Sequence, residues 1–117
     1  MKVGIQGSRN FNDYQVFLRA MRIVLSEVER NGDTELTLFS VGSVNTNNHA
    51  TEFINIAERT LKSQNVRPKV MRIPISWMEE NITDMDYFAY FCNEKENVSP
   101  LVDLADEKSV DAGIFRS

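Results

Sequence analysis

The sequence predicts an α/β fold in which a mostly parallel sheet of about four to five strands lies between two layers of helices. Short apolar segments alternate along the chain with longer segments of helical periodicity. The segment 36–41 is apolar on both faces, which is typical of a strand inside a parallel sheet. A length of 117 residues suits one domain, which we expect to span residues 1–117. The predicted architecture is a Rossmann-like three-layer domain.

The first strand and the first helix have the clearest signals. Residues 3–6 are apolar and precede a turn, so they predict a strand. We expect Asn10 or Asn12 to cap the next helix, because short polar side chains accept hydrogen bonds from free backbone amides. An amphipathic helix ending at Asn31-Gly32 is predicted by apolar residues three and four apart, namely Tyr14, Phe17, Leu18, Met21, Val24, Leu25 and Val28.

The second helical unit is predicted to begin after a polar loop. Gly42-Ser43 ends the second strand, and the run 45–48 is expected to be a loop. The helix that follows has its apolar side formed by Ala50, Phe53, Ile54, Ala57 and Leu61. Residues 69–73 then predict a third strand between two prolines.

The last part of the chain is less regular. Met85, Phe88, Ala89 and Cys92 share helical spacing and predict a third helix, with Cys92 in the core. Ser99-Pro100 predicts the start of a short helix that runs to about residue 108. Residues 112–115 predict a final strand. The aromatic residues at 77–91 cannot all face one way on a helix, and a homo-oligomer contact is our preferred interpretation, with stacking on a base as the alternative.

Composition narrows the classes of function. The formal net charge of −4 marks a small acidic protein and argues against nucleic-acid binding, which needs a basic face. One histidine and one cysteine cannot supply a zinc site, so we expect no metal and no other cofactor. The single cysteine fits a reducing compartment. With neither a signal-peptide pattern nor a membrane-length apolar run, we expect a cytoplasmic protein without a membrane partner.

Two predicted loops carry the candidate binding residues, because ligands of parallel α/β sheets bind beyond the carboxyl ends of the strands. The first loop contains Gly7, Ser8, Arg9 and Asn10, and we expect its amides, hydroxyl and guanidinium to hold a phosphate. The second loop contains Gly42, Ser43, Asn45, Thr46 and Asn48, which we expect near a ribose or base. Both loops also have a purely structural interpretation, as turns and helix caps.

The segment 2–14, with its strand, its Gly7-Ser8-Arg9 step and a short turn before a long helix, resembles the opening of the SLOG superfamily. The YspA/YpsA-related branch is the most similar. The second half of the family pattern aligns with Phe39–Asn48, then with Thr51-Glu52, and then with the strand that leads to Trp77. The resemblance covers roughly residues 1–77 and implies a Rossmann-like domain that binds a nucleotide or a nucleotide-derived molecule.

The second motif departs from the family pattern. Ser43 stands where the family has a second glycine, Asn45 replaces its arginine, Thr46 its later glycine and Asn48 its aspartate. The Pro-Gly-Gly-x-Gly-Thr-x-x-Glu signature of the cytokinin-activating LOG branch is missing, and Glu52 alone remains near its glutamate position. The resemblance therefore implies ligand binding through Gly7, Ser8 and Arg9 more strongly than it implies catalysis.

Four hypotheses follow from these patterns. The first is non-catalytic binding of a nucleotide-like small molecule. The second is hydrolysis of the N-glycosidic bond of nucleoside monophosphates, for which Glu52 is the candidate acid–base residue, although a structural role near a helix start suits it as well. The third is a protein-interaction module or small inhibitor on the same fold, such as a phage encodes. The fourth is single-stranded DNA binding, against which the acidic charge argues. We further expect His49 to face solvent and Asp84 and Asp86 to be first-turn helix acids rather than cation ligands.

Overall fold

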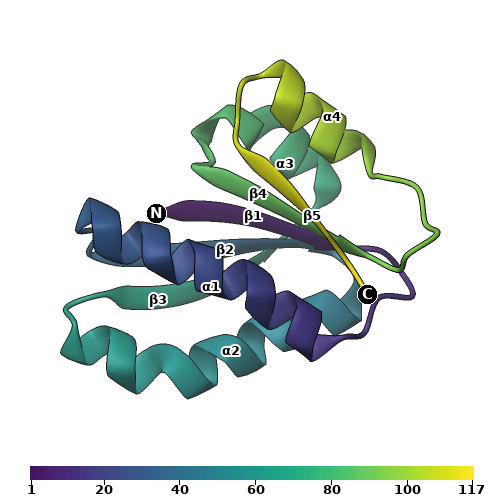
Figure 1. Ribbon diagram of the computed structural model, residues 1–117. Coiled ribbons are helices and arrows are strands. Elements are labelled where there is room, and N and C mark those ends of the chain that lie inside the picture. The colour runs from purple at the N-terminus through teal and green to yellow at the C-terminus, as the bar shows by residue number, and fades with distance from the viewer.

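The computed structural model describes residues 1–117 and contains a five-stranded parallel sheet with the strand order β3-β2-β1-β4-β5. The strands are β1 (Lys2–Gly7), β2 (Glu35–Gly42), β3 (Arg67–Ile73), β4 (Tyr87–Cys92) and β5 (Ala112–Arg116). Helices α1 (Tyr14–Asn31) and α2 (Val44–Ser63) cover one face, and α3 (Ile75–Asn81) and α4 (Pro100–Glu107) cover the other (Figure 1). A short 3-10 helix, η1 (Ile82–Asp84), follows α3. The predicted Rossmann-like three-layer α/β fold is confirmed.

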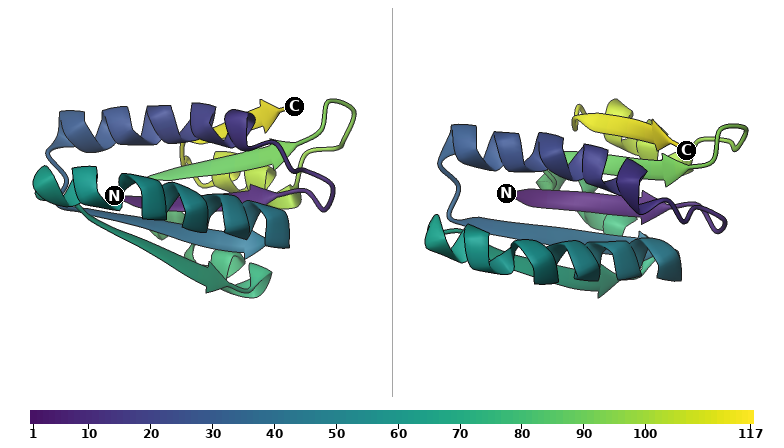
Figure 2. Two further views of the ribbon diagram at one scale, coloured as in Figure 1. Left: turned by 90° about the horizontal axis from the view of Figure 1, so that it is seen from below. Right: turned by 60° about the horizontal axis from the view of Figure 1, so that its bottom comes forward.

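Two apolar cores lie on opposite faces of the sheet, because successive side chains of a strand point to opposite faces. Val3 and Ile5 of β1 and Phe91 of β4 belong to the core beneath α1 and α2. Phe88 and Cys92 of β4 belong to the core beneath α3 and α4. Figure 2 shows α1 and α2 side by side along the first of these faces. None of the helices has both the length and the apolarity needed to cross a bilayer.

The direction in which successive strands are added to the sheet reverses between β1 and β4. It proceeds outward from β1 to β3 and then returns to place β4 on the other side of β1. The loops that follow β1 and β4 therefore diverge to helices on opposite faces of the sheet. Such a reversal is the usual place of a ligand crevice in this class of fold.

The helix predicted around 85–92 is wrong, since this segment is the strand β4. Every residue from Tyr87 to Cys92 is apolar or aromatic, so a three-and-four spacing can be chosen from it by chance. Tyr87, Ala89 and Phe91 face the core of α1, while Phe88, Tyr90 and Cys92 face the opposite core. A strand that is buried on both faces explains the continuous apolar run, and it confirms Cys92 as a core residue.

The polar loop predicted at 45–48 is also wrong, because α2 begins at Val44 and includes these residues. Thr46 is fully buried, and His49 is only 8% exposed, so the expectation that His49 faces solvent is wrong as well. Tertiary packing of this first turn against β1 and α1 outweighs the weak helix propensity of asparagine. The left-handed backbone of Gly42, with φ 82°, makes the sharp turn from β2 into the helix.

The cap of α1 differs from the prediction as well. Asp13, rather than Asn10 or Asn12, precedes the helix, and its carboxylate accepts hydrogen bonds from the backbone amides of Gln15 and Val16. Phe11 is fully buried and draws the intervening chain into the core, so the helix begins later than the asparagines suggest. The end of α1 is as predicted, with Gly32 in the left-handed conformation. The Ser99 cap and Pro100 start of α4 are confirmed too.

Candidate functional site

The loops expected to bind a ligand lie together at the carboxyl edge of the sheet. Gly7 at the end of β1 pairs in register with Gly42 of β2 and with Phe91 of β4. The β1–α1 connection thus lies between the start of α2 and the β4–α4 loop. These two sides of β1 have different structures, one open and one closed.

On the open side, a shallow hollow of about 410 Å³ lies between the ends of β1 and β2. Five of the predicted binding residues line it together with Val44, namely Gly7, Arg9, Gly42, Ser43 and Asn45. Arg9 is exposed and is the only charged residue among them. The remaining predicted binding residues, Ser8, Asn10, Thr46 and Asn48, do not line this hollow.

The start of α2 faces this hollow without a cap. Ser43 occupies the capping position but makes no side-chain hydrogen bond to the first turn. The first amides of a helix have no partner inside the helix, so they need a side chain, water or a ligand. The positive end of the dipole of this 20-residue helix therefore borders the same hollow as Arg9. A helix start and a guanidinium are both groups that stabilise a bound anion.

The start of α1, by contrast, is already occupied by a negative group. The Asp13 carboxylate lies 3.1 Å from the Gln15 nitrogen and 3.2 Å from the Val16 nitrogen. The amides of Gln15 and Val16 at the start of α1 are thus bonded within the chain. Of the two long helices, only α2 starts without a side-chain cap.

The closed side of β1 is filled by the β4–α4 loop. The Ser8 hydroxyl donates a 2.7 Å hydrogen bond to Oε1 of Glu96, and the backbone N–H of Asn93 donates another of 2.7 Å to the same oxygen. The Asn93 amide side chain also donates to the carbonyl oxygen of Asn10, at 3.4 Å. The hydrogen bonds from the Asn93 amide and Ser8 hydroxyl hold the pKa of the Glu96 carboxyl below its ordinary value. No sequence pattern pairs these loops, because Ser8 and Glu96 are far apart in the chain.

Thr46 and Asn48 do not contribute to the hollow as the second motif suggested. Thr46 is buried against Gly7, and its hydroxyl has no hydrogen-bond partner. Asn48 is exposed one turn along α2 and does not border the hollow. Gly42 is held by Arg72, whose guanidinium donates to the Gly42 carbonyl oxygen at 3.4 Å.

The rings of Phe11, Tyr14 and Phe17 surround His49, with the Tyr14 ring centroid 5.4 Å from that of the imidazole. Burial lowers the pKa of His49, and the carboxylates of Glu52 and Asp13 oppose that shift. The Nε2 atom of the imidazole is buried without a partner. Glu52 is exposed on α2 and does not line the hollow, so the geometry does not place it as an acid or base there.

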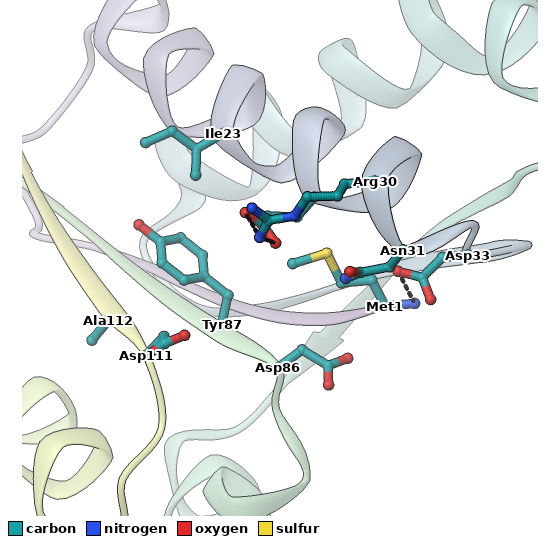
Figure 3. Close-up of a pocket in the computed structure, with 10 residues that line it drawn as sticks. Met1, Ile23, Arg30, Asn31, Asp33, Asp86, Tyr87, Asp111 and Ala112 are labelled. Carbon is teal, nitrogen blue, oxygen red and sulfur yellow. Dashed lines mark hydrogen bonds and ion pairs between the residues drawn. The ribbon is translucent and has the colours of Figure 1, made fainter.

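A different hollow lies at the amino edge of the sheet, where the sequence analysis placed no site (Figure 3). Its volume is about 550 Å³, and its lining includes Ile23, Arg30, Asp86, Tyr87 and Asp111. Arg30 is already paired with Glu27 on the same helix, and the Asp86 carboxylate accepts from the Lys2 amide. Burial, and then the nearby Asp111, raise the pKa of Tyr87. Two pairs of lining groups are bonded to each other, namely Arg30 with Glu27 and the Met1 amino group with Asp33.

The remaining sequence expectations concern acids and aromatic residues. Asp84 lies in the first turn of the short helix η1, as expected of a helix acid. Asp86 lies outside any helix, just before β4, so the expectation is wrong for Asp86. Trp77 stacks on Phe39 with ring centroids 5.1 Å apart, and Phe91 packs inside the α1 core. No cluster of three or more potential metal-ligating side chains is present.

The sequence matches no protein-family model, and no curated protein matches it. The geometry of the carboxyl edge and the resemblance of the first strand and loop are the observations that bear on the function of the chain.

Proposed function

We propose that this chain binds a nucleotide or a nucleotide-derived small molecule through a phosphate group seated between Arg9 and the first turn of α2. The observation that carries the proposal is the uncapped start of a long helix beside the only charged side chain of the hollow. A phosphate supplies the acceptor oxygens that these amides lack, and a guanidinium adds charge-assisted hydrogen bonds. The Gly7-Ser8-Arg9 resemblance supports a nucleotide as the class of ligand.

The proposal is binding without turnover. Hydrolysis of an N-glycosidic bond needs a positioned acid or base beside the bound sugar. Glu52, the only candidate from the sequence, does not border the hollow, and no other carboxylate lines it. Ser43 and Asn45, which line the hollow with Arg9, carry side chains that can hydrogen-bond to a polar ligand, and this supports recognition without turnover.

A thermal-shift screen of nucleotides tests the proposal first, because a ligand that binds only the folded state raises the Tm by mass action. Calorimetry of the best nucleotide then compares wild type with Arg9→Ala and with Arg19→Ala, an exposed arginine of α1 outside the hollow. Loss of a charge-assisted contact should weaken binding by about 10- to 100-fold in Arg9→Ala. Arg19→Ala should bind like wild type. Equal affinity of the two variants would contradict the proposal.

A protein-interaction module is the second candidate. It is favoured by the closed side of the carboxyl edge and by apolar side chains at the β3 end of the molecule, where Met71 is 38% and Ile75 50% exposed. In this second proposal a partner protein covers these exposed apolar side chains, and the hollow binds no ligand. A nucleotide-dependent thermal shift that Arg9→Ala abolishes would favour the first candidate over this one.

A further inference from the structure

The β4–α4 loop lies across the point where the sheet reverses its strand order. In Figures 1 and 2 this loop and the β1–α1 loop project from the same edge of the sheet. The Glu96 carboxylate joins them, because its Oε1 accepts from the Ser8 hydroxyl and from the Asn93 amide. The crevice that such folds use for ligands is thus closed here by a negatively charged side chain of the protein itself.

The loop is held in this closed arrangement by the end of β5. The Arg116 guanidinium donates to the carbonyl oxygens of Asn93, Glu94 and Glu96, at 3.3, 3.1 and 2.8 Å. The Ser117 hydroxyl donates to the Asn93 side chain at 2.8 Å. These bonds fix the backbone of the loop, whereas the contact with the β1–α1 loop depends on the side chains of Glu96 and Asn93. The Glu96 side chain can therefore leave Ser8 and the Asn93 amide while the hydrogen bonds from Arg116 still hold the loop backbone.

The two donors that Glu96 occupies suit any anionic oxygen. A hydroxyl and a backbone N–H that converge on one carboxylate oxygen present the same geometry to a phosphate oxygen. Ser8 lies on the closed side of β1, whereas Arg9 borders the hollow on the open side, so an anion bound at Ser8 would occupy a second subsite. The carboxylate also opposes a second negative charge in this place.

We propose that Glu96 is a built-in competitor for the anionic ligand, which keeps the Ser8 and Asn93 donors closed until a phosphate group displaces it. The inference rests on the proposed function, since it concerns regulation of the same loop. It makes Glu96 a determinant of affinity: the wild-type chain binds anions weakly at Ser8, and loss of the carboxylate opens this second subsite.

Inorganic pyrophosphate is the probe, and Glu96→Ala and Glu96→Gln are the test variants. Glu94→Gln is the matched control, because Glu94 is exposed in the same loop and only its carbonyl oxygen is bonded. It removes the same charge without freeing Ser8. Glu96→Gln keeps an oxygen that can accept from Ser8, so it also serves if Glu96→Ala fails to fold. Amide chemical-shift titrations measure the affinity and report which residues respond.

The expected result is about 10-fold tighter binding of pyrophosphate by Glu96→Ala, a smaller gain in Glu96→Gln and no change in Glu94→Gln. The amides of Ser8 and Asn93 should shift with pyrophosphate in the Glu96 variants much more than in wild type. Equal affinity in all four proteins, or an equal gain in Glu94→Gln, would overturn the proposal. So would tighter binding that leaves the Ser8 and Asn93 amides unmoved.

The same titration separates this inference from the proposed function. Shifts at Arg9 and at 42–45 in wild type, with no gain in Glu96→Ala, support the proposed function and overturn the role of Glu96. Shifts at Ser8 and Asn93 in Glu96→Ala, with none at Arg9 or 42–45 in any protein, support the role of Glu96 and contradict the site at α2. If pyrophosphate shifts none of these amides in any variant, both are overturned.

Discussion

The Thr46 hydroxyl lies 1.7 Å from the position that a Cβ atom on Gly7 would take. The first turn of α2 therefore packs directly on the backbone at the end of β1. The glycine that the sequence presents as part of a ligand loop also has a structural reason, because the two elements could not approach so closely with any side chain at this position. This contact also determines how near the start of α2 lies to Arg9.

Gly7→Ala is expected to lower the free energy of unfolding by about 1–3 kcal/mol, because the added methyl group overlaps with Thr46. Chemical denaturation of the variant measures the change. Thr46→Ala in the Gly7→Ala background should recover part of the loss, since the Thr46 Cβ would still lie 2.8 Å away. A double variant that is no more stable than Gly7→Ala would show that the strain lies elsewhere.

Asp13→Ala is expected to lower the free energy of unfolding by about 1 kcal/mol, because the amides of Gln15 and Val16 lose their cap. The control is Asn12→Ala, an exposed neighbour, which should change stability by less than about 0.5 kcal/mol. Denaturant unfolding of the two variants checks both values. A larger loss of stability in Asn12→Ala than in Asp13→Ala would support the asparagine cap expected from the sequence.

His49 should make the protein less stable in mild acid. Its folded-state pKa lies below the ordinary value of 6.5, so the unfolded chain binds a proton more readily than the folded chain. The stability that neutral His49 contributes to the folded state is therefore fully present above the pKa of the unfolded chain. It is lost as the pH falls through and below 6.5. His49→Phe, which keeps the aromatic packing with Phe11, Tyr14 and Phe17, should remove this dependence. Unfolding curves at several pH values between about 7 and 5 measure it. Parallel pH profiles for wild type and variant would contradict the prediction.

Ser8→Ala is expected to raise the pKa of Glu96 toward its ordinary value, because one of the two hydrogen bonds to its carboxylate disappears. A carbon-detected NMR titration of the glutamate carboxyl groups gives this pKa directly. Ser26→Ala, on the exposed surface of α1, serves as the control and should leave it unchanged. An unchanged pKa in Ser8→Ala would mean that the Ser8–Glu96 contact does not persist in solution.

The layered fold was predictable because α1, α2 and the first strands have strong periodic patterns. The spacing from Tyr14 to Val28 describes the buried face of α1, and Gly32 marks its end as expected. The order of the last elements was not predictable in the same way. A fully apolar segment such as Tyr87–Cys92 satisfies helical and strand spacing equally, and only burial on both faces of the sheet decides between them.

The two loops of the candidate site were predictable from the sequence, but the arrangement of their side chains was not. Arg9, Gly42 and Ser43 do meet at one hollow, as the parallel order implied. The Asp13 cap is a local contact, and it was missed because Asn10 and Asn12 are equally favoured capping residues. The Glu96–Ser8 contact was not predictable, because the two residues are 88 positions apart in the chain. Polar residues such as Thr46 and His49 have no sequence signal for burial, because tertiary packing alone decides it.

The central place of β1 in the sheet has a consequence for how the chain acquires its structure. β1 pairs with β2 on one side, but its other neighbour, β4, ends only at Cys92. During synthesis one edge of β1 therefore stays unpaired until the chain as far as Cys92 has left the ribosome. Pairing of such distant segments is entropically slow, so the nascent chain passes through a stage in which β1 is open to wrong partners.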